Sequence, residues 1–141
     1  MTVHDASFHE LSGTQVYAIL RLRSEVFVVE QACVYLDPDG RDIESGTRHI
    51  WTERGGTIEA CLRVLDDGDV RRFGRVATRG SARGTGLAAT LIEHALATTV
   101  GPWVLDAQAH LAGWYERFGF AVTGAEFDED GIAHVPMRRA N

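Results

Sequence analysis

The sequence predicts an α/β fold in which a central, mostly antiparallel sheet is flanked by helices. Three strand patterns separated by short turns, between residues 48 and 78, are typical of an antiparallel meander. A strand, helix, strand alternation follows in the second half of the chain, which predicts parallel pairing there and therefore a mixed sheet. The most regular helix pattern, residues 83–99, begins directly at a glycine-rich turn.

The N-terminal part combines one strand, one helix and one long loop. Residues Thr2–Phe8 are expected to form a short strand. A helix then begins at Ser12 and is expected to run to about Glu30, because Ser12 and Gln15 have capping-box spacing and apolar residues recur at helical spacing. The polar stretch Gln31–Thr47 is expected to be a loop, and loops longer than ~12 residues in a compact domain often bind ligands.

The remaining elements follow in a regular order. The expected strands are Arg48–Glu53, Thr57–Leu65, Val70–Thr78, Trp103–Asp106, Phe120–Thr123 and Ile132–Met137. The expected helices are Arg83–Thr99, which Gly101-Pro102 stops, and Leu111–Phe118, which Gly119 ends. In Thr57–Leu65 the apolar residues Ile58, Ala60, Leu62 and Val64 alternate with Glu59, Cys61 and Arg63, which places the apolar face of that strand in the core.

Length and composition indicate one domain spanning residues 1–141. The chain has 45% hydrophobic and 24% charged residues, close to the averages for globular proteins, so it can bury a core. No stretch approaches the ~20 consecutive apolar residues that span a bilayer. The first ten residues do not have the pattern of a secretory signal. We therefore expect a cytoplasmic protein with no membrane partner.

The charge balance and the cysteines exclude several function classes. The net charge is −6 and the arginines are scattered, which argues against a nucleic-acid partner. The same acidic balance is compatible with a cationic substrate such as an amine, although solubility alone also favours it. Cys33 and Cys61 have no zinc-site spacing, so no metal is expected and both are interpreted as reduced thiols. A Cys33–Cys61 bridge and a reactive Cys33 remain alternatives.

The segment from Arg75 to Leu91 carries the clearest chemical signal. A strand leads into a glycine-rich turn that opens a helix, so the backbone N–H groups from Gly84 to Ala88 have no helical partners. The helix dipole favours an anion at this position, and glycines without a Cβ let a phosphate approach the backbone. Arg83 adds a positive charge. The sequence therefore predicts a pyrophosphate cradle.

The spacing excludes two common phosphate sites. A P-loop requires G-x-x-x-x-G-K-[ST], and the chain contains no lysine. A dinucleotide site requires G-x-G-x-x-G near the start of a parallel sheet, whereas these glycines follow an antiparallel meander. A glycine-rich packing turn without a ligand, and a nucleotide site of another type, remain alternatives.

Several motifs resemble the GNAT acyltransferase superfamily. The run Arg83-Gly-Thr-Gly-Leu-Ala88 resembles its R/Q-x-x-G-x-G/A signature, and Tyr115-Glu-Arg-Phe-Gly-Phe120 resembles its Y-E-K-x-G-F segment. A narrower resemblance to the ElaA-type subfamily covers most of the chain. It rests on Leu22–Gln31, Ala107–Leu111 and Glu129–His134, among other residues.

The resemblance implies a sheet with a splayed pair of parallel strands and acetyl-CoA as acyl donor. The pantetheine arm would pair with the edge of strand Val76–Thr78, and the thioester would lie between that strand and Trp103–Asp106. Gln108 stands where many members have asparagine. The coenzyme-binding residues that the resemblance implies are Val76, Ala77, Thr78, Arg83, Gly84, Thr85, Gly86, Leu87, Ala88 and Gln108.

The resemblance also implies direct attack of an amine within a ternary complex. Tyr115 matches the family's tyrosine near the coenzyme sulfur and is the candidate general acid, the alternative being a packing role. The stretch Val70–Arg79, which includes the fourth expected strand, has no carboxylate to act as base. His49, His134 and Glu30 are therefore base candidates, with a water chain as an equal alternative.

The acceptor site is the least determined part of the sequence. By the subfamily resemblance, Glu30, Gln31, Tyr35 and Asp39 line an acceptor pocket; loop capping is the alternative. The acceptor is a small-molecule or protein amine, and a homodimer is compatible with the family. Two other activities remain open: a non-catalytic acyl-CoA-binding module, and an acyl-homoserine-lactone synthase, for which the chain is short.

Overall fold

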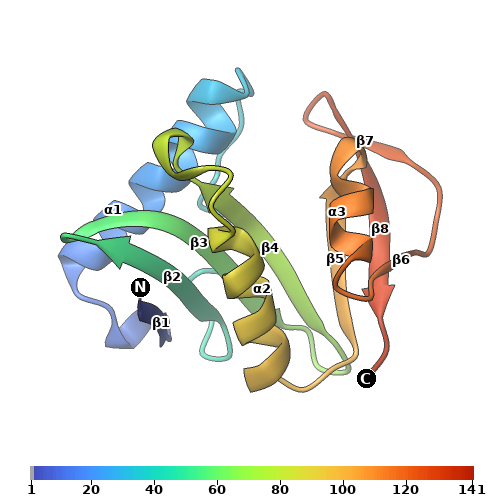
Figure 1. Cartoon of the computed structure of the whole chain (residues 1–141), viewed down its shortest axis with the longest axis horizontal. Coiled ribbons are helices and arrows are strands. Elements are labelled where there is room, and N and C mark those ends of the chain that lie inside the picture. Colours follow the sequence, from blue (N-terminus) through green and yellow to red (C-terminus); the bar gives the residue numbers. More distant parts are fainter. Residues whose placement is uncertain (1) are drawn as a thin grey trace.

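The computed structural model describes residues 2–141, and its strands form one eight-stranded sheet (Figure 1). The strands are β1 (Thr2–Ala6), β2 (Arg48–Arg54), β3 (Thr57–Asp66), β4 (Arg71–Thr78), β5 (Trp103–Gln108), β6 (Ala121–Val122), β7 (Phe127–Glu129) and β8 (Ile132–Arg139). The α-helices are α1 (Gly13–Arg23), α2 (Leu87–Thr98) and α3 (Ala112–Glu116). The strand order is β1-β2-β3-β4-β5-β8-β6, and β7 also pairs with β8.

Helices cover both faces of the N-terminal half of the sheet. Successive residues of a strand point to opposite faces, so Ile50 and Leu62 pack in the core that contains α2. Trp51 and Cys61 point the other way, into the core beneath α1. Burial on both faces explains why Cys61, expected on the polar side of its strand, is 3% exposed.

The parallel pair at the centre of the sheet is splayed, as the resemblance implies. Strands β4 and β5 pair only where Arg71–Phe73 meets Trp103–Leu105, and they diverge beyond that point (Figure 1). A β-bulge follows directly: between Cys61 and Arg63, β3 has one residue where β4 has two, Arg75 and Val76. Because a bulge bends its strand, it turns β4 away from β5. The edge of β4 that faces β5 is therefore left unpaired after Phe73.

The N-terminal helix ends at Glu30, close to its expected end, although it is α-helical only to Arg23 and continues as a π-helix, Ser24–Glu30. Other expected boundaries were wrong. The first strand ends at Ala6, and a 3₁₀ turn follows. Helix α2 begins at Leu87 rather than Arg83, because Gly84 and Gly86 have φ of 79° and 80°, which no helix accommodates.

The C-terminal half also differs in two respects. Strand β7 was not predicted; it forms a hairpin with β8 through a turn at Asp130-Gly131. Strand β6 lies beside β8 and runs antiparallel to it, so the second strand, helix, strand unit does not add a parallel neighbour to β5. Among residues 2–141, no helix has the length and apolar character to cross a membrane.

Candidate active site

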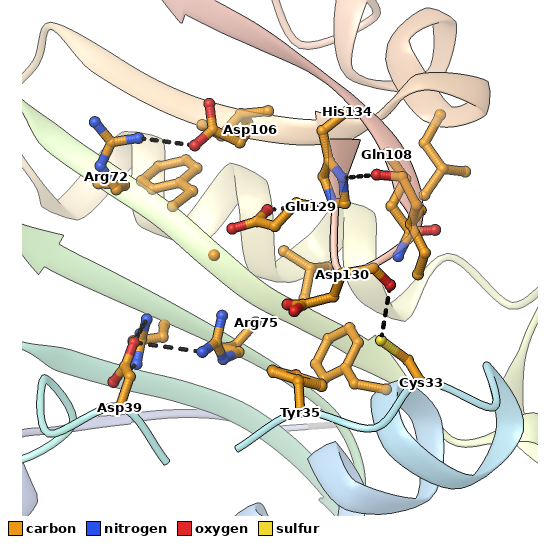
Figure 2. Close-up of a pocket in the computed structure, with 18 of the residues that line it drawn as sticks. Cys33, Tyr35, Asp39, Arg72, Arg75, Asp106, Gln108, Glu129, Asp130 and His134 are labelled. Atoms are coloured by element: carbon orange, nitrogen blue, oxygen red, sulfur yellow. Dashed lines mark hydrogen bonds and ion pairs between the residues drawn. The ribbon is translucent and has the colours of Figure 1, made fainter. Parts of the chain in front are cut away.

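A cavity of about 450 Å³ lies where β4 and β5 diverge. Its N-terminal wall comes from β3, from β4 and from the segment that follows the π-helix, and its C-terminal wall comes from β5, α3 and the β7–β8 hairpin (Figure 2). Cys33 joins the two walls, because its thiol donates to the carbonyl oxygen of Asp130 at 3.3 Å (Figure 2). The cavity thus spans the opening that the bulge in β4 creates.

His134 and Tyr115 bring acid–base groups to the C-terminal wall. His134 Nδ1 lies 2.8 Å from the carbonyl oxygen of Ile132. A carbonyl oxygen only accepts, so Nδ1 carries the proton and Nε2 of the neutral ring is left with a free lone pair. Glu129 Oε2 lies 3.6 Å from that Nε2. Glu129 is therefore placed to stabilise the imidazolium once Nε2 has taken a proton.

Tyr115 stands on α3 with its ring in the core and is 7% exposed. Burial raises the pKa of its phenol to about 12, and no charged neighbour contributes to that change. The hydroxyl is therefore neutral across the physiological range and can act as a hydrogen-bond donor towards the cavity. Tyr115 lines the cavity from α3.

In and behind the N-terminal wall, three arginines and three aspartates form what we call the Arg–Asp cluster: Arg23, Arg63, Arg75, Asp37, Asp39 and Asp42. Arg23 is 1% exposed; its Nε lies 2.7 Å from Asp37, and its Nη1 lies 2.7 Å from Asp42. The place of Arg23 on the expected N-terminal helix predicts a solvated or paired charge. It is paired, but it is buried.

Arg75 belongs to the same cluster and explains how the bulge is held. Its φ is 51°, a left-handed conformation that costs a non-glycine residue about 1–2 kcal/mol. Its Nε lies 2.9 Å from Asp37 Oδ1, and its Nη2 lies 3.3 Å from Asp39 Oδ2. Tyr35 also donates to Asp37, at 2.6 Å. These contacts fix the conformation of the bulged residue and hold the loop of residues 31–47 against β4.

The cluster lowers the pKa of Asp39 and of Asp42. Burial raises the pKa of Asp42, but hydrogen bonds and charge from Arg23 and Arg63 outweigh it and lower the pKa below the ordinary value. Burial likewise raises the pKa of Asp39, and hydrogen bonds from Arg63 and from the backbone of Arg41 outweigh it. Both side chains are therefore ionised at neutral pH.

The predicted phosphate cradle lies at the start of α2. The first helical hydrogen bond runs from the Thr90 N–H to the Gly86 carbonyl oxygen, so the preceding N–H groups are free of helical partners. A Cβ placed on Gly84 or Gly86 would meet no atom within 4 Å, so the cradle opens outward. Arg83 lies beside it and donates to the Thr78 carbonyl oxygen at 3.0 Å.

The predicted site residues fall into separate places. Seven of them line the cavity: Gln31, Tyr35, Asp39, Val76, Gln108, Tyr115 and His134. Glu30 lies outside it, with Oε2 2.6 Å from Arg83 Nη1 beside the cradle. His49 is 4% exposed under α1, with Nε2 3.0 Å from the Asp42 carbonyl oxygen, and burial lowers its pKa. The structure therefore does not bring His49 to the cavity.

The sequence did not identify several residues that line the cavity, among them Arg72, Arg75, Asp106, Glu129 and Asp130. No local sequence pattern predicts the β-bulge at Arg75. The Asp130-Gly131 dipeptide, however, is a common hairpin turn, and it could have predicted β7 and placed Glu129 beside His134. The two cysteines are free thiols, and burial raises the pKa of Cys61 to about 12.

Comparison with known proteins identifies the family. Residues 18–140 match the model of the acetyltransferase (GNAT) domain. The chain belongs to the GNAT acetyltransferase family. It is 39% identical to protein ElaA of Escherichia coli, over 96% of this chain and 94% of ElaA. It is 46% identical to a UPF0039 protein of Mycobacterium tuberculosis, over 92% of this chain and 87% of that protein.

Solved structures of GNAT proteins have the same fold. An acyl-CoA N-acyltransferase from Pseudomonas aeruginosa superposes with a TM-score of 0.93 at 38% identity, covering 99% of this chain and 100% of that one. Escherichia coli ElaA superposes with a TM-score of 0.91 at 38% identity and covers 98% of both chains. An aminoglycoside 6'-N-acetyltransferase complexed with coenzyme A shares only the fold: its TM-score is 0.75 at 10% identity, with 99% and 97% coverage.

Proposed function

We propose that this GNAT protein transfers an acetyl group from acetyl-CoA to an amine acceptor by direct attack in a ternary complex. One observation carries the proposal. The unpaired edge of β4 leads from the cavity to the glycine cradle at the start of α2. An extended donor that is held at the cradle and pairs with this edge would bring its reactive end into the cavity beside Tyr115.

The residues of the cradle fit coenzyme A. Free N–H groups at the start of α2 and the open faces of Gly84 and Gly86 suit the pyrophosphate. Arg83 is oriented by Thr78 and pairs with Glu30 at the edge of the cradle, where the pyrophosphate would compete with Glu30 for its guanidinium group. Val76 and Thr78 would offer backbone groups to the pantetheine amides. The coenzyme supplies an acetyl thioester, which is activated towards amines.

The cavity side chains can assist both the attack of the amine and the departure of the sulfur. His134 Nε2 accepts a proton from the attacking amine, and Glu129 stabilises the imidazolium that results. Tyr115 donates a hydrogen bond to the departing sulfur and stabilises the thiolate as the carbon–sulfur bond breaks. The amine nitrogen forms the new bond to the acetyl carbon, so no side chain of the protein is acylated. Much of the rate comes from holding the two reactants together.

Steady-state kinetics test this proposal. The release of coenzyme A thiol should depend on both acetyl-CoA and an amine, and double-reciprocal plots at several amine concentrations should intersect. Parallel lines would indicate a covalent acetyl-enzyme and contradict direct attack. Binding of acetyl-CoA without turnover for any amine would favour a non-catalytic acyl-CoA-binding module. Turnover only with S-adenosylmethionine as acceptor would favour a synthase of acyl-homoserine lactones.

A further inference from the structure

An ion pair joins the glycine cradle to the end of the π-helix (Figure 1). Arg83 lies at the cradle, and Glu30, 53 residues earlier in the chain, is the last residue of the π-helix. Glu30 Oε2 lies 2.6 Å from Arg83 Nη1, and Arg83 Nη2 donates to Glu30 Oε1 at 2.9 Å. Both carboxylate oxygens therefore contact the outer edge of the guanidinium group, which is the two-point geometry in which arginine also binds phosphate.

This pairing leaves Arg83 without a free edge for a phosphate. A guanidinium group binds an anion at two points through its Nη1–Nη2 edge or through the edge that contains Nε. Glu30 occupies the first edge, and on the second edge Nε donates to the Thr78 carbonyl oxygen at 3.0 Å. A pyrophosphate can therefore receive two hydrogen bonds from one edge of Arg83 only after one partner has left. Glu30 is the partner that an arriving anion repels, because both are negatively charged.

The backbone keeps Glu30 at the cradle while its side chain can move. The N–H groups of Gln31 and Ala32 donate to carbonyl oxygens of the π-helix, and Ala32 has a φ of 50°, so the chain turns directly after Glu30. The Glu30 side chain itself is 47% exposed and can rotate into solvent without disturbing buried residues. A side-chain rotation is therefore enough to release Arg83 and to restore the pair afterwards.

We propose that Glu30 is a built-in competitor of the donor: its carboxylate occupies Arg83 in the free protein, and the pyrophosphate of acetyl-CoA displaces it. This inference rests on the proposed function and adds a control of donor affinity to it. The product, coenzyme A, carries the same pyrophosphate, so Glu30 weakens the binding of both and favours release of the product. Glu30 lies outside the cavity, which places its role with the donor rather than with the acceptor.

Calorimetric titration with coenzyme A tests the inference through Glu30→Gln, which keeps the size of the side chain and removes its charge. The affinity should rise about two- to fivefold, the range that an exposed ion pair allows. Glu25→Gln is the matched control, because Glu25 lies on the same π-helix, is 51% exposed and pairs with Arg21 instead. It should leave the affinity unchanged. Equal affinities of wild type and Glu30→Gln would overturn the inference.

Arg83→Gln distinguishes competition for the guanidinium group from simple repulsion between Glu30 and the ligand. Alone, this change should weaken the binding of coenzyme A. In the Arg83→Gln background, Glu30→Gln should add little affinity, because the group for which the carboxylate competes is gone. The same gain in both backgrounds would show that Glu30 only repels the ligand. Binding by Arg83→Gln as tight as that of wild type would show that the pyrophosphate does not use Arg83, and either result overturns the inference.

A comparison of two ligands completes the test and separates this inference from the proposed function. Glu30→Gln should raise the affinity for acetyl-CoA and for coenzyme A by the same factor, since both carry the pyrophosphate. A gain confined to acetyl-CoA would place the effect at the acetyl end and overturn the inference. If wild type binds both ligands and Glu30→Gln binds them no better, the competitor is ruled out and the donor site stands. Failure of folded wild type to bind either ligand would overturn the proposed function itself.

Discussion

Both walls of the cavity carry charged side chains but use them differently. On the N-terminal wall, the arginines are tied to aspartates in or next to the Arg–Asp cluster, whose member Arg23 is 1% exposed. On the C-terminal wall, carboxylates face the cavity beside His134 and Tyr115 with few protein partners. The charge that a pocket offers to a ligand thus depends on what its residues already bind, and not on its composition.

The difference has an energetic counterpart. Breaking a buried ion pair leaves an uncompensated charge in a poorly solvated place, whereas removing an exposed charge changes stability little. Changes in the N-terminal wall should therefore act mainly on folding. Changes in the C-terminal wall should act mainly on chemistry and selectivity.

The largest effect on stability is expected from Arg23→Ala. This change leaves Asp37 and Asp42 without their main buried partner and should lower the free energy of unfolding by about 3–5 kcal/mol. The matched control is Arg21→Ala on the same helix, where the side chain is 67% exposed and pairs with Glu25. It should cost less than about 1 kcal/mol. Urea denaturation measures both, and equal losses would contradict the contrast between buried and exposed charge.

A smaller loss, in turnover alone, is expected for Tyr115→Phe. The phenylalanine keeps the packing of the ring but removes the hydroxyl that donates to the departing sulfur, so kcat should fall ~100-fold. Affinity for acetyl-CoA and the urea midpoint should change little. Tyr17→Phe is the control, because Tyr17 is exposed on α1. Unchanged turnover in Tyr115→Phe would remove this residue from the mechanism.

The smallest effect is a pH dependence of stability. The pKa of Asp39 is lowered in the folded protein, so its contribution is complete above the ordinary carboxyl value near ~4 and is lost as the pH falls towards the folded pKa. Stability should therefore decline below about pH 4, and Asp39→Asn should make that decline shallower. Asp106→Asn, outside the Arg–Asp cluster, is the comparison. An identical decline in wild type and Asp39→Asn would show that the cluster does not hold this carboxylate ionised.

The sequence predicts the features that are encoded locally. The meander, the glycine turn before α2 and the Tyr115 motif each depend on neighbouring residues, and the fold prediction was confirmed. The splayed parallel pair came from the family resemblance, and the structure adds its cause, the bulge at Arg75.

The Arg–Asp cluster could not be predicted, because its members come from α1, the following loop, β3 and β4. Helical spacing alone predicts that the aliphatic part of the Arg23 side chain is buried and that its guanidinium group is exposed. Only the folded chain brings Asp37 and Asp42 to its guanidinium group. For the same reason the base candidates could not be separated: His49 and His134 both lie on strands, and the packing of α1 buries one of them away from the cavity.

The most direct test of the central claim is a calorimetric titration of the protein with acetyl-CoA, with ATP and NAD as comparison ligands. Gly86→Glu places bulk and negative charge in the cradle and should abolish binding. Gly68→Glu is the matched control, because Gly68 has the same φ of 80° and equally open surroundings but lies in the turn at the opposite end of β4. The account predicts saturable binding of acetyl-CoA to wild type and Gly68→Glu only. Binding that survives in a folded Gly86→Glu, or no binding to a folded wild type, would contradict it.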